Sequence, residues 1–177
     1  MTNIKTKEKK TPIIRQFSAG GVVFKKEDGK ILWLLVQPKR GDDFHNQIRW
    51  QLPKGLINEE ENLEQTAIRE VKEEGGVKAK IVQKIDTIKI FFKNTFGGKP
   101  EETVLKTITF FLMEYKEDIK EGFGWETQKV AWLPFNQAKE KLTFKSEKEI
   151  LCKAQKILEE TQQPLFQVRI FPQNKIK

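Results

Sequence analysis

The sequence is poor in the residues that build disulfides and histidine-based sites. Its 177 residues include one cysteine, Cys152, and one histidine, His45. A single cysteine excludes an intramolecular disulfide and a thiolate metal cluster, so we interpret Cys152 as a buried structural thiol. Nothing in the sequence gives His45 a serine, aspartate or metal partner. We therefore expect His45 to be a surface or substrate-proximal residue rather than a catalytic one.

The sequence also lacks a long apolar run. A membrane-spanning helix needs roughly 18 apolar residues in succession, and the first ten residues, MTNIKTKEKK, lack the apolar core of a secretory signal. We expect a cytoplasmic protein with no membrane partner. The length fits one globular domain at 15–161, with a basic flexible arm at 1–14 and a C-terminal extension at 162–177.

Acidic residues are outnumbered by basic ones. The chain has 33 Lys and Arg against 25 Asp and Glu, a net charge of +8. Such an excess favours polyanionic partners such as nucleotides, nucleic acids or anionic membrane surfaces. Charge alone does not choose among them.

Runs of β-branched and aromatic residues predict strands. The segments 17–26 and 31–37 flank the turn-forming EDGK and predict a hairpin. The segments 81–92 and 103–115 predict two antiparallel strands joined by a loop. A short strand and two helices follow, over 130–134, 136–144 and 146–160. Strands first, one helix in the middle and helices at the end indicate an α+β sandwich rather than regular βαβ alternation.

The middle helix is bounded by clear signals. Asn62 is a suitable N-cap, and Gln65 can reach back to it as in a capping box. Gly75 and Gly76 supply the backbone freedom that ends helices. The sequence therefore predicts a helix from about residue 63 to about residue 74, with Ala67, Ile68 and Val71 in its buried stripe.

This helix gathers negative charge at its C-terminal end. At 100° per residue, Glu73 and Glu74 lie within about 60° of Glu70, so the three acids share one face. Like charges at these spacings cost a few tenths of a kcal/mol each, and the helix dipole adds to the cost. A solvated acidic face, relieved by Arg69 and Lys72, is one interpretation. Because Lys72 points away, we favour a site for Mg²⁺, which prefers carboxylate oxygens.

The same stretch resembles the Nudix box, G-x5-E-x7-R-E-U-x-E-E-x-G-U with U aliphatic. All nine defined positions match without a gap: Gly55, Glu61, Arg69, Glu70, Val71, Glu73, Glu74, Gly76 and Val77. The flanking segments SAGGVVF, WQLPKG and VAWLP are also similar to family segments. The resemblance implies the Nudix fold, an α/β/α sandwich with a central mixed β-sheet.

Members of this family hydrolyse a nucleoside diphosphate linked to a further group, using Mg²⁺ or Mn²⁺. The resemblance implies that Glu70, Glu73 and Glu74 bind the metal, with a carbonyl of Lys54 or Gly55 as a further ligand. It also implies that Glu61 assists and that Arg69 orients the acids. The general base is either a box glutamate or a distal carboxylate. Glu126, six residues before Trp132, is the distal candidate and a further metal ligand, with a plain surface acid as the alternative.

The segment WQLPKG resembles the diadenosine tetraphosphate, or dinucleoside polyphosphate, hydrolases, and inositol pyrophosphate enzymes share a similar segment. By this resemblance Lys106 and, more weakly, Lys54 bind a nucleotide polyphosphate substrate. For Lys106 a solvated lysine is the alternative. Trp50 is a candidate for stacking on the base, with a place in the core as its alternative.

Other functions stay open at this stage. They are RNA 5′-pyrophosphate removal, hydrolysis of oxidised nucleoside triphosphates, and, in another class, a non-catalytic nucleotide-binding regulator. The intact box argues against the regulator. Whether the protein is a monomer or a homodimer is also left open.

Overall fold

The computed structural model describes residues 13–39, 48–94 and 102–162. His45, the segment 163–177 and nearly all of the predicted N-terminal arm lie outside these ranges. No helix within them has the length and hydrophobicity to cross a membrane.

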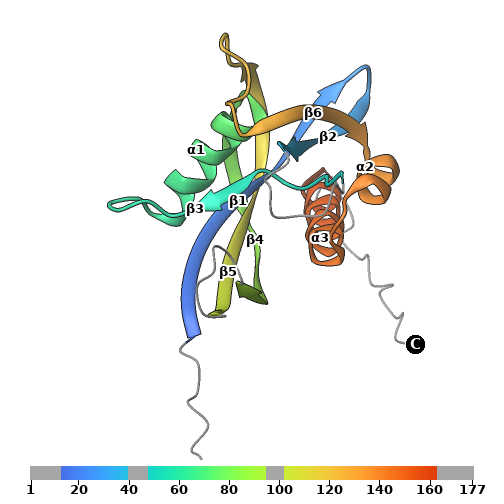
Figure 1. Ribbon diagram of the computed structural model, residues 1–177. Coiled ribbons are helices and arrows are strands. Elements are labelled where there is room, and N and C mark those ends of the chain that lie inside the picture. Colours follow the sequence, from blue (N-terminus) through green and yellow to red (C-terminus); the bar gives the residue numbers. More distant parts are fainter. Residues whose placement is uncertain (1–12, 40–47, 95–101, 163–177) are drawn as a thin grey trace, which may run out of the picture.

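A single mixed sheet forms the centre of the molecule (Figure 1). Its strands are β1 (Ile13–Glu27), β2 (Lys30–Pro38), β3 (Lys54–Leu56), β4 (Val77–Asn94), β5 (Glu102–Asp118) and β6 (Thr127–Pro134). The order is β4-β5-β1-β2-β6, and β3 pairs with β1 beside this path. β1 runs parallel to β5, whereas the other pairs are antiparallel. The mixed sheet predicted from the sequence is confirmed.

Both predicted strand pairs are present. The β1–β2 hairpin turns at Asp28 and Gly29, whose φ angles of 49° and 73° suit the tight turn of a twisted hairpin. β4 and β5 pair along nearly their whole length, with three irregularities in register.

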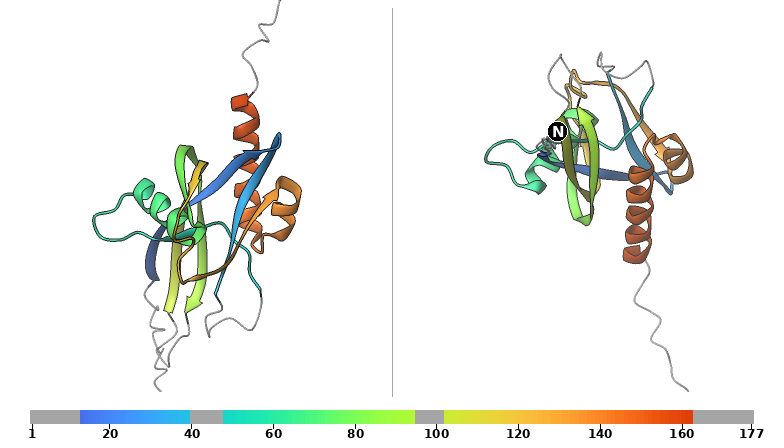
Figure 2. Two further views of the ribbon diagram at one scale, coloured as in Figure 1. Left: turned by 90° about the horizontal axis from the view of Figure 1, so that it is seen from above. Right: turned by 60° about the horizontal axis from the view of Figure 1, so that its bottom comes forward.

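Within the described ranges, three helices cover the two faces of the sheet (Figure 2). They are α1 (Leu63–Gly75), α2 (Phe135–Lys141) and α3 (Lys145–Gln162). Ala67 and Val71 of α1 pack with Phe111 and Met113 in one apolar cluster. The second cluster joins α2 and α3 to residues such as Trp33 and Phe110. Two separate cores on one sheet are what an α/β/α sandwich requires. Cys152 of α3 is free and half-buried, so the expectation of a buried thiol is wrong.

Helix α1 begins and ends where the sequence predicts, to within one residue. The Asn62 side chain accepts a hydrogen bond from the Gln65 backbone N–H, and the Gln65 side chain accepts one from the Asn62 N–H, both at 2.9 Å. Gly76 closes the helix with φ of 67°. The predicted burial of Ile68 is wrong, because Ile68 is 45% exposed and Glu70 faces inward instead. The buried stripe therefore carries an acid into the protein.

Candidate active site

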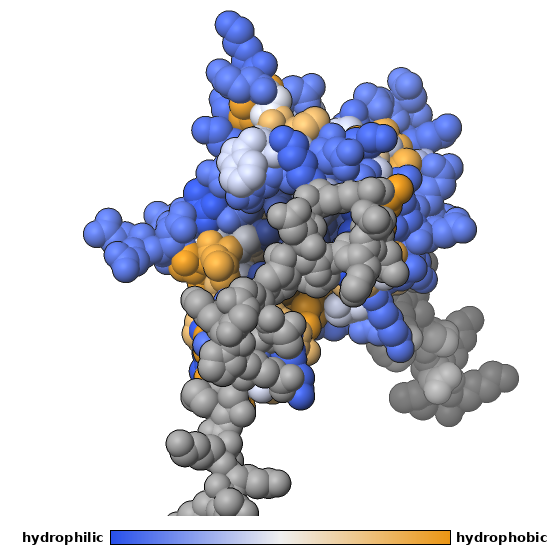
Figure 3. Space-filling model, viewed as in Figure 1, coloured by the Kyte–Doolittle hydropathy of each residue, from blue (hydrophilic) through white to orange (hydrophobic). Residues whose placement is uncertain are grey.

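A cavity of about 660 Å³ opens where α1, β3, β5 and the connection from β5 to β6 meet. Its lining residues are Lys54, Gly55, Leu56, Asn58, Arg69, Glu70, Glu73, Glu74, Lys106, Gly124, Trp125 and Glu126. The face of the molecule seen in Figure 3 is mainly hydrophilic around α1, with smaller hydrophobic patches. Four acids and three bases thus share one cavity, which suits a highly charged ligand.

The predicted acids come together from two parts of the chain. Glu70, Glu73 and Glu74 come from the last turns of α1, and Glu126 comes from the β5–β6 connection. Glu126 is close enough to raise the pKa of Glu70 and Glu74, as a lesser cause beside burial. The distal acid therefore lies in the same site as the helix acids.

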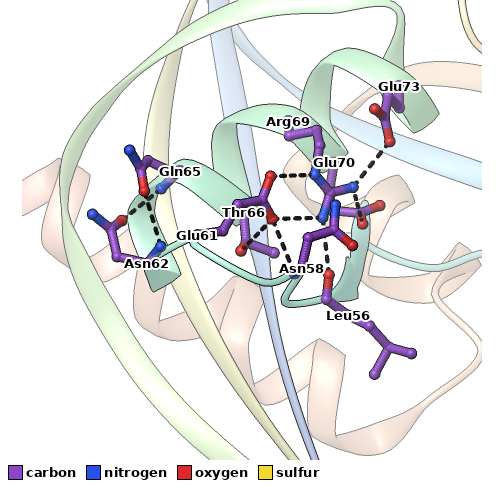
Figure 4. Close-up of polar contacts among 9 residues, drawn as sticks. All are labelled: Leu56, Asn58, Glu61, Asn62, Gln65, Thr66, Arg69, Glu70 and Glu73. Atoms are coloured by element: carbon purple, nitrogen blue, oxygen red, sulfur yellow. Dashed lines mark hydrogen bonds and ion pairs between the residues drawn. The ribbon is translucent and has the colours of Figure 1, made fainter.

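Arg69 holds several of these acids in place (Figure 4). Its Nε lies 2.7 Å and its Nη2 3.0 Å from the two carboxylate oxygens of Glu61. Its Nη1 donates to Glu70 at 2.6 Å and to Glu73 at 3.0 Å, and Nη2 also donates to the Leu56 carbonyl at 2.9 Å. The guanidinium lowers the pKa of Glu61 to about 2. Glu61 itself is not among the cavity-lining residues and acts on the site through Arg69.

Glu70 can lie where it does because residue 55 has no side chain. A Cβ atom at Gly55 would overlap the Glu70 carboxylate. Burial raises the pKa of Glu70, and the neighbouring Arg69 opposes that rise. The first glycine of the box therefore makes room for the first helix acid.

Glu74 is the one of the three helix acids that forms no ion pair with Arg69. Its Oε2 accepts one hydrogen bond from the Lys54 backbone N–H at 2.8 Å. Burial raises its pKa to about 7, and the nearby Lys54 opposes this only in part. A half-buried carboxylate of this kind is stabilised by a cation.

The donors in the cavity fit a hard divalent cation, because they are carboxylate and carbonyl oxygens. Among the described residues, however, no three acidic side chains already form a group that could hold one metal ion. Instead, the Arg69 guanidinium forms ion pairs with both Glu70 and Glu73. The chemistry of the predicted ligands fits Mg²⁺, whereas their present side-chain positions serve the Arg69 network.

Two lysines, Lys54 and Lys106, add positive charge to the same cavity. Lys54 forms a buried ion pair with Glu147 of α3 at 2.9 Å. Burial and the neighbouring Lys54 lower the pKa of Lys106, whose ammonium makes no ion pair with another described residue. Sequence reasoning missed Glu147, since nothing in the pattern of α3 distinguishes this acid from its exposed neighbours.

Trp50 does not reach the cavity. Its ring packs at the edge of the larger core and lies under the ammonium of Lys141, 4.5 Å from the ring centre. Trp125 lines the cavity instead, and 77% of it is exposed. Sequence reasoning missed Trp125, and its position next to Glu126 is the signal that could have pointed to it.

Comparison with known proteins agrees with this architecture. The family model described as the NUDIX domain matches residues 15–154. The chain is 30% identical over 135 residues to the asymmetrical bis(5′-nucleosyl)-tetraphosphatase of Sus scrofa, covering 76% of this chain and 85% of that protein. It is 30% identical over 149 residues to MutT4, a candidate mutator protein of Mycobacterium tuberculosis, covering 84% of this chain but 58% of that protein.

A solved structure shares the fold. The C. elegans Ap4A hydrolase in a binary complex superposes with a TM-score of 0.60 and 24% identity, over 82% of this chain and 98% of that one.

Proposed function

The chain belongs to the NUDIX family and hydrolyses pyrophosphate bonds, and from that premise we propose that its substrates are dinucleoside polyphosphates of the diadenosine tetraphosphate type. The observation that carries the proposal is the pair of lysines, Lys54 and Lys106, in one cavity with four carboxylates. The similarity to the tetraphosphatase of Sus scrofa supports the same substrate class.

The lysines bind the phosphate chain. Lys106 lies in the cavity with no carboxylate of the described residues paired to it, so its charge is available to a phosphate. Lys54, at the start of β3, is the weaker candidate, because its ammonium is already paired with Glu147. A lysine acts on phosphate as a point charge and needs no two-pronged geometry.

The acids hold the metal. Mg²⁺, or Mn²⁺ in its place, would be held by Glu70, Glu73, Glu74, Glu126 and the Gly55 carbonyl. When bound, it would supply the positive charge that stabilises the oxygens of the transition state. Arg69, fixed by Glu61, orients Glu70 and Glu73. Calorimetric titration with Mg²⁺ and Mn²⁺ tests the site directly, and no uptake with or without a nonhydrolysable dinucleotide would contradict it.

Glu126 is our candidate for the general base, with a helix glutamate as the alternative. The base would take a proton from the attacking water. If Glu126 has this role, Glu126→Gln changes the pH dependence of the rate as well as its size. An unchanged pH–rate profile would assign the proton to a helix acid.

A substrate panel tests the proposal. We expect the protein with Mg²⁺ to cleave diadenosine tetraphosphate to ATP and AMP far faster than it cleaves other substrates. Chromatography of the products measures these rates. Oxidised nucleoside triphosphates are the second candidate, and the net charge favours RNA 5′-pyrophosphate ends as a third. Faster cleavage of oxidised dGTP or of RNA ends would overturn the first assignment.

A further inference from the structure

Trp125 is an apolar side chain exposed in an unusual place. It is 77% exposed and lines the charged cavity between Gly124 and Glu126. An indole left in water forgoes the free energy that its burial would give. None of the ring pairs and cation–π contacts of the described residues involves it. The fold therefore presents this ring at the site without using it for packing.

The segment that carries Trp125 is fastened to the C-terminal end of α1. The Gly124 N–H donates to the Glu73 carbonyl at 2.6 Å, and the Thr127 hydroxyl donates to the Glu74 carbonyl at 3.0 Å. The Ile119 N–H donates to the Gly76 carbonyl at 2.8 Å. In Figure 1 this connection rises beside α1. Glu73 and Glu74, whose side chains line the cavity, thus also hold the chain on both sides of Trp125 through their backbone carbonyls.

Close packing adds to these hydrogen bonds. A Cβ atom on Gly76 would lie 2.7 Å from the Phe123 nitrogen and 2.9 Å from the Gly122 carbonyl carbon. Only a residue without a side chain lets the connection approach the helix end this closely. A ring held on such a support loses little freedom when a ligand stacks on it.

We propose that Trp125 is the platform on which a nucleobase of the substrate stacks, which makes it a specificity residue for polyphosphates that carry an aromatic ring. This inference rests on the proposed function, since the base must be joined to the phosphates that Lys54 and Lys106 bind. Aromatic side chains stack on any base, and the contact typically changes affinity by roughly tenfold to a hundredfold.

The surroundings of Trp125 favour a nucleotide over two other ligands. The centre of a protein–protein interface is depleted of charge, whereas this ring adjoins four carboxylates and three cationic side chains. Inositol pyrophosphates and inorganic polyphosphates are suitably charged but have no aromatic ring to stack. The combination of charges with one exposed indole fits a phosphorylated nucleoside.

Steady-state kinetics on diadenosine tetraphosphate test the platform. Trp125→Ala should raise KM about tenfold to a hundredfold with kcat within about threefold, while Trp125→Phe keeps most of the affinity. Phe123→Ala is the matched control, because Phe123 lies on the same connection, is 42% exposed and is not among the cavity-lining residues. Inhibition by inorganic tripolyphosphate should be equal in the parent and Trp125→Ala, because that ligand has no ring.

An unchanged KM in Trp125→Ala would overturn the proposal, and so would an equal weakening of tripolyphosphate inhibition. Indole fluorescence separates this inference from the proposed function. Titration with AMP should quench the parent and leave Trp125→Phe unchanged, whichever polyphosphate proves to be hydrolysed. No quenching in the folded parent at saturating AMP would contradict stacking, while failure to cleave diadenosine tetraphosphate would contradict only the substrate assignment.

Discussion

The ammonium of Lys54 lies 2.9 Å from the carboxylate of Glu147, so an ion pair buried in the protein joins the candidate active site to helix α3. The other oxygen of Glu147 accepts a hydrogen bond from the Leu52 backbone N–H at 2.8 Å. One acid therefore fixes both the backbone and the lysine at the start of β3.

Removing this acid should destabilise the fold. Glu147→Ala leaves a buried ammonium and a buried N–H without partners, and we expect a loss of about 3 to 5 kcal/mol. Glu147→Gln keeps an acceptor for Leu52 and should lose less. Urea unfolding measures both. Lys153→Ala, which breaks the exposed α3 pair with Asp86, is the control and should cost less than about 1 kcal/mol. Equal losses in Glu147→Ala and the control would contradict the role of Glu147.

Glu74→Gln should lower hydrolysis by several orders of magnitude and leave the fold intact. The substitution removes a proposed metal ligand and also relieves repulsion among the acids. Far-ultraviolet circular dichroism checks the fold, and phosphate release checks the rate. Glu64→Gln, in the exposed first turn of the same helix, should keep full activity. A Glu74→Gln rate within twofold of the parent would exclude the assignment.

The same residue predicts how stability depends on pH in the metal-free protein. Burial raises the pKa of Glu74 from 4.5 to about 7. Because the folded state then holds this proton more tightly than the unfolded state, the free energy of unfolding falls as pH rises from about 4.5 through about 7. The loss is on the order of 3 kcal/mol. Glu74→Gln should remove this component, so that the variant is the more stable protein above pH 7. Parallel parent and variant curves would show that Glu74 titrates normally.

Two glycines with similar φ angles, Gly29 and Gly76, should respond differently to substitution by alanine. Gly29 has φ of 73° and open space where a Cβ atom would lie, whereas Gly76 has φ of 67° with the β5–β6 connection against it. Gly29→Ala should cost only the left-handed penalty of about 1 to 2 kcal/mol. Gly76→Ala should cost more and should also raise KM, because the connection that carries Trp125 must move. Thermal unfolding and KM measured on both variants provide the check, and equal effects would mean that the connection adapts freely.

Local signals made much of this structure predictable. The turn at Asp28 and Gly29 and the capping box of Asn62 and Gln65 are short-range patterns, and the structure contains both. The spacing of the acids on α1 likewise predicted that Glu70, Glu73 and Glu74 share one face, and all three line one cavity. Such features depend on neighbours a few residues away.

Contacts between distant segments were not predictable in this way. Glu147 meets Leu52 across 95 positions, and no local pattern marks either residue. Trp50 was the predicted stacking residue, but the fold places its ring against the core and brings Trp125 to the cavity instead. The inward turn of Glu70 in place of Ile68 depends on the space that Gly55 leaves in β3.

The parallel pairing of β1 with β5 has a consequence for how the chain folds. Residues 13–24 meet residues 103–114, so the sheet cannot close until most of the chain is available. Contacts between such distant segments slow folding, because closing the long intervening loop costs conformational entropy before the contacts form. During synthesis on the ribosome, the β1–β2 hairpin therefore emerges early and waits with both edges unpaired, until β5 joins β1 and β6 joins β2. This interval is when the nascent protein most needs protection from aggregation.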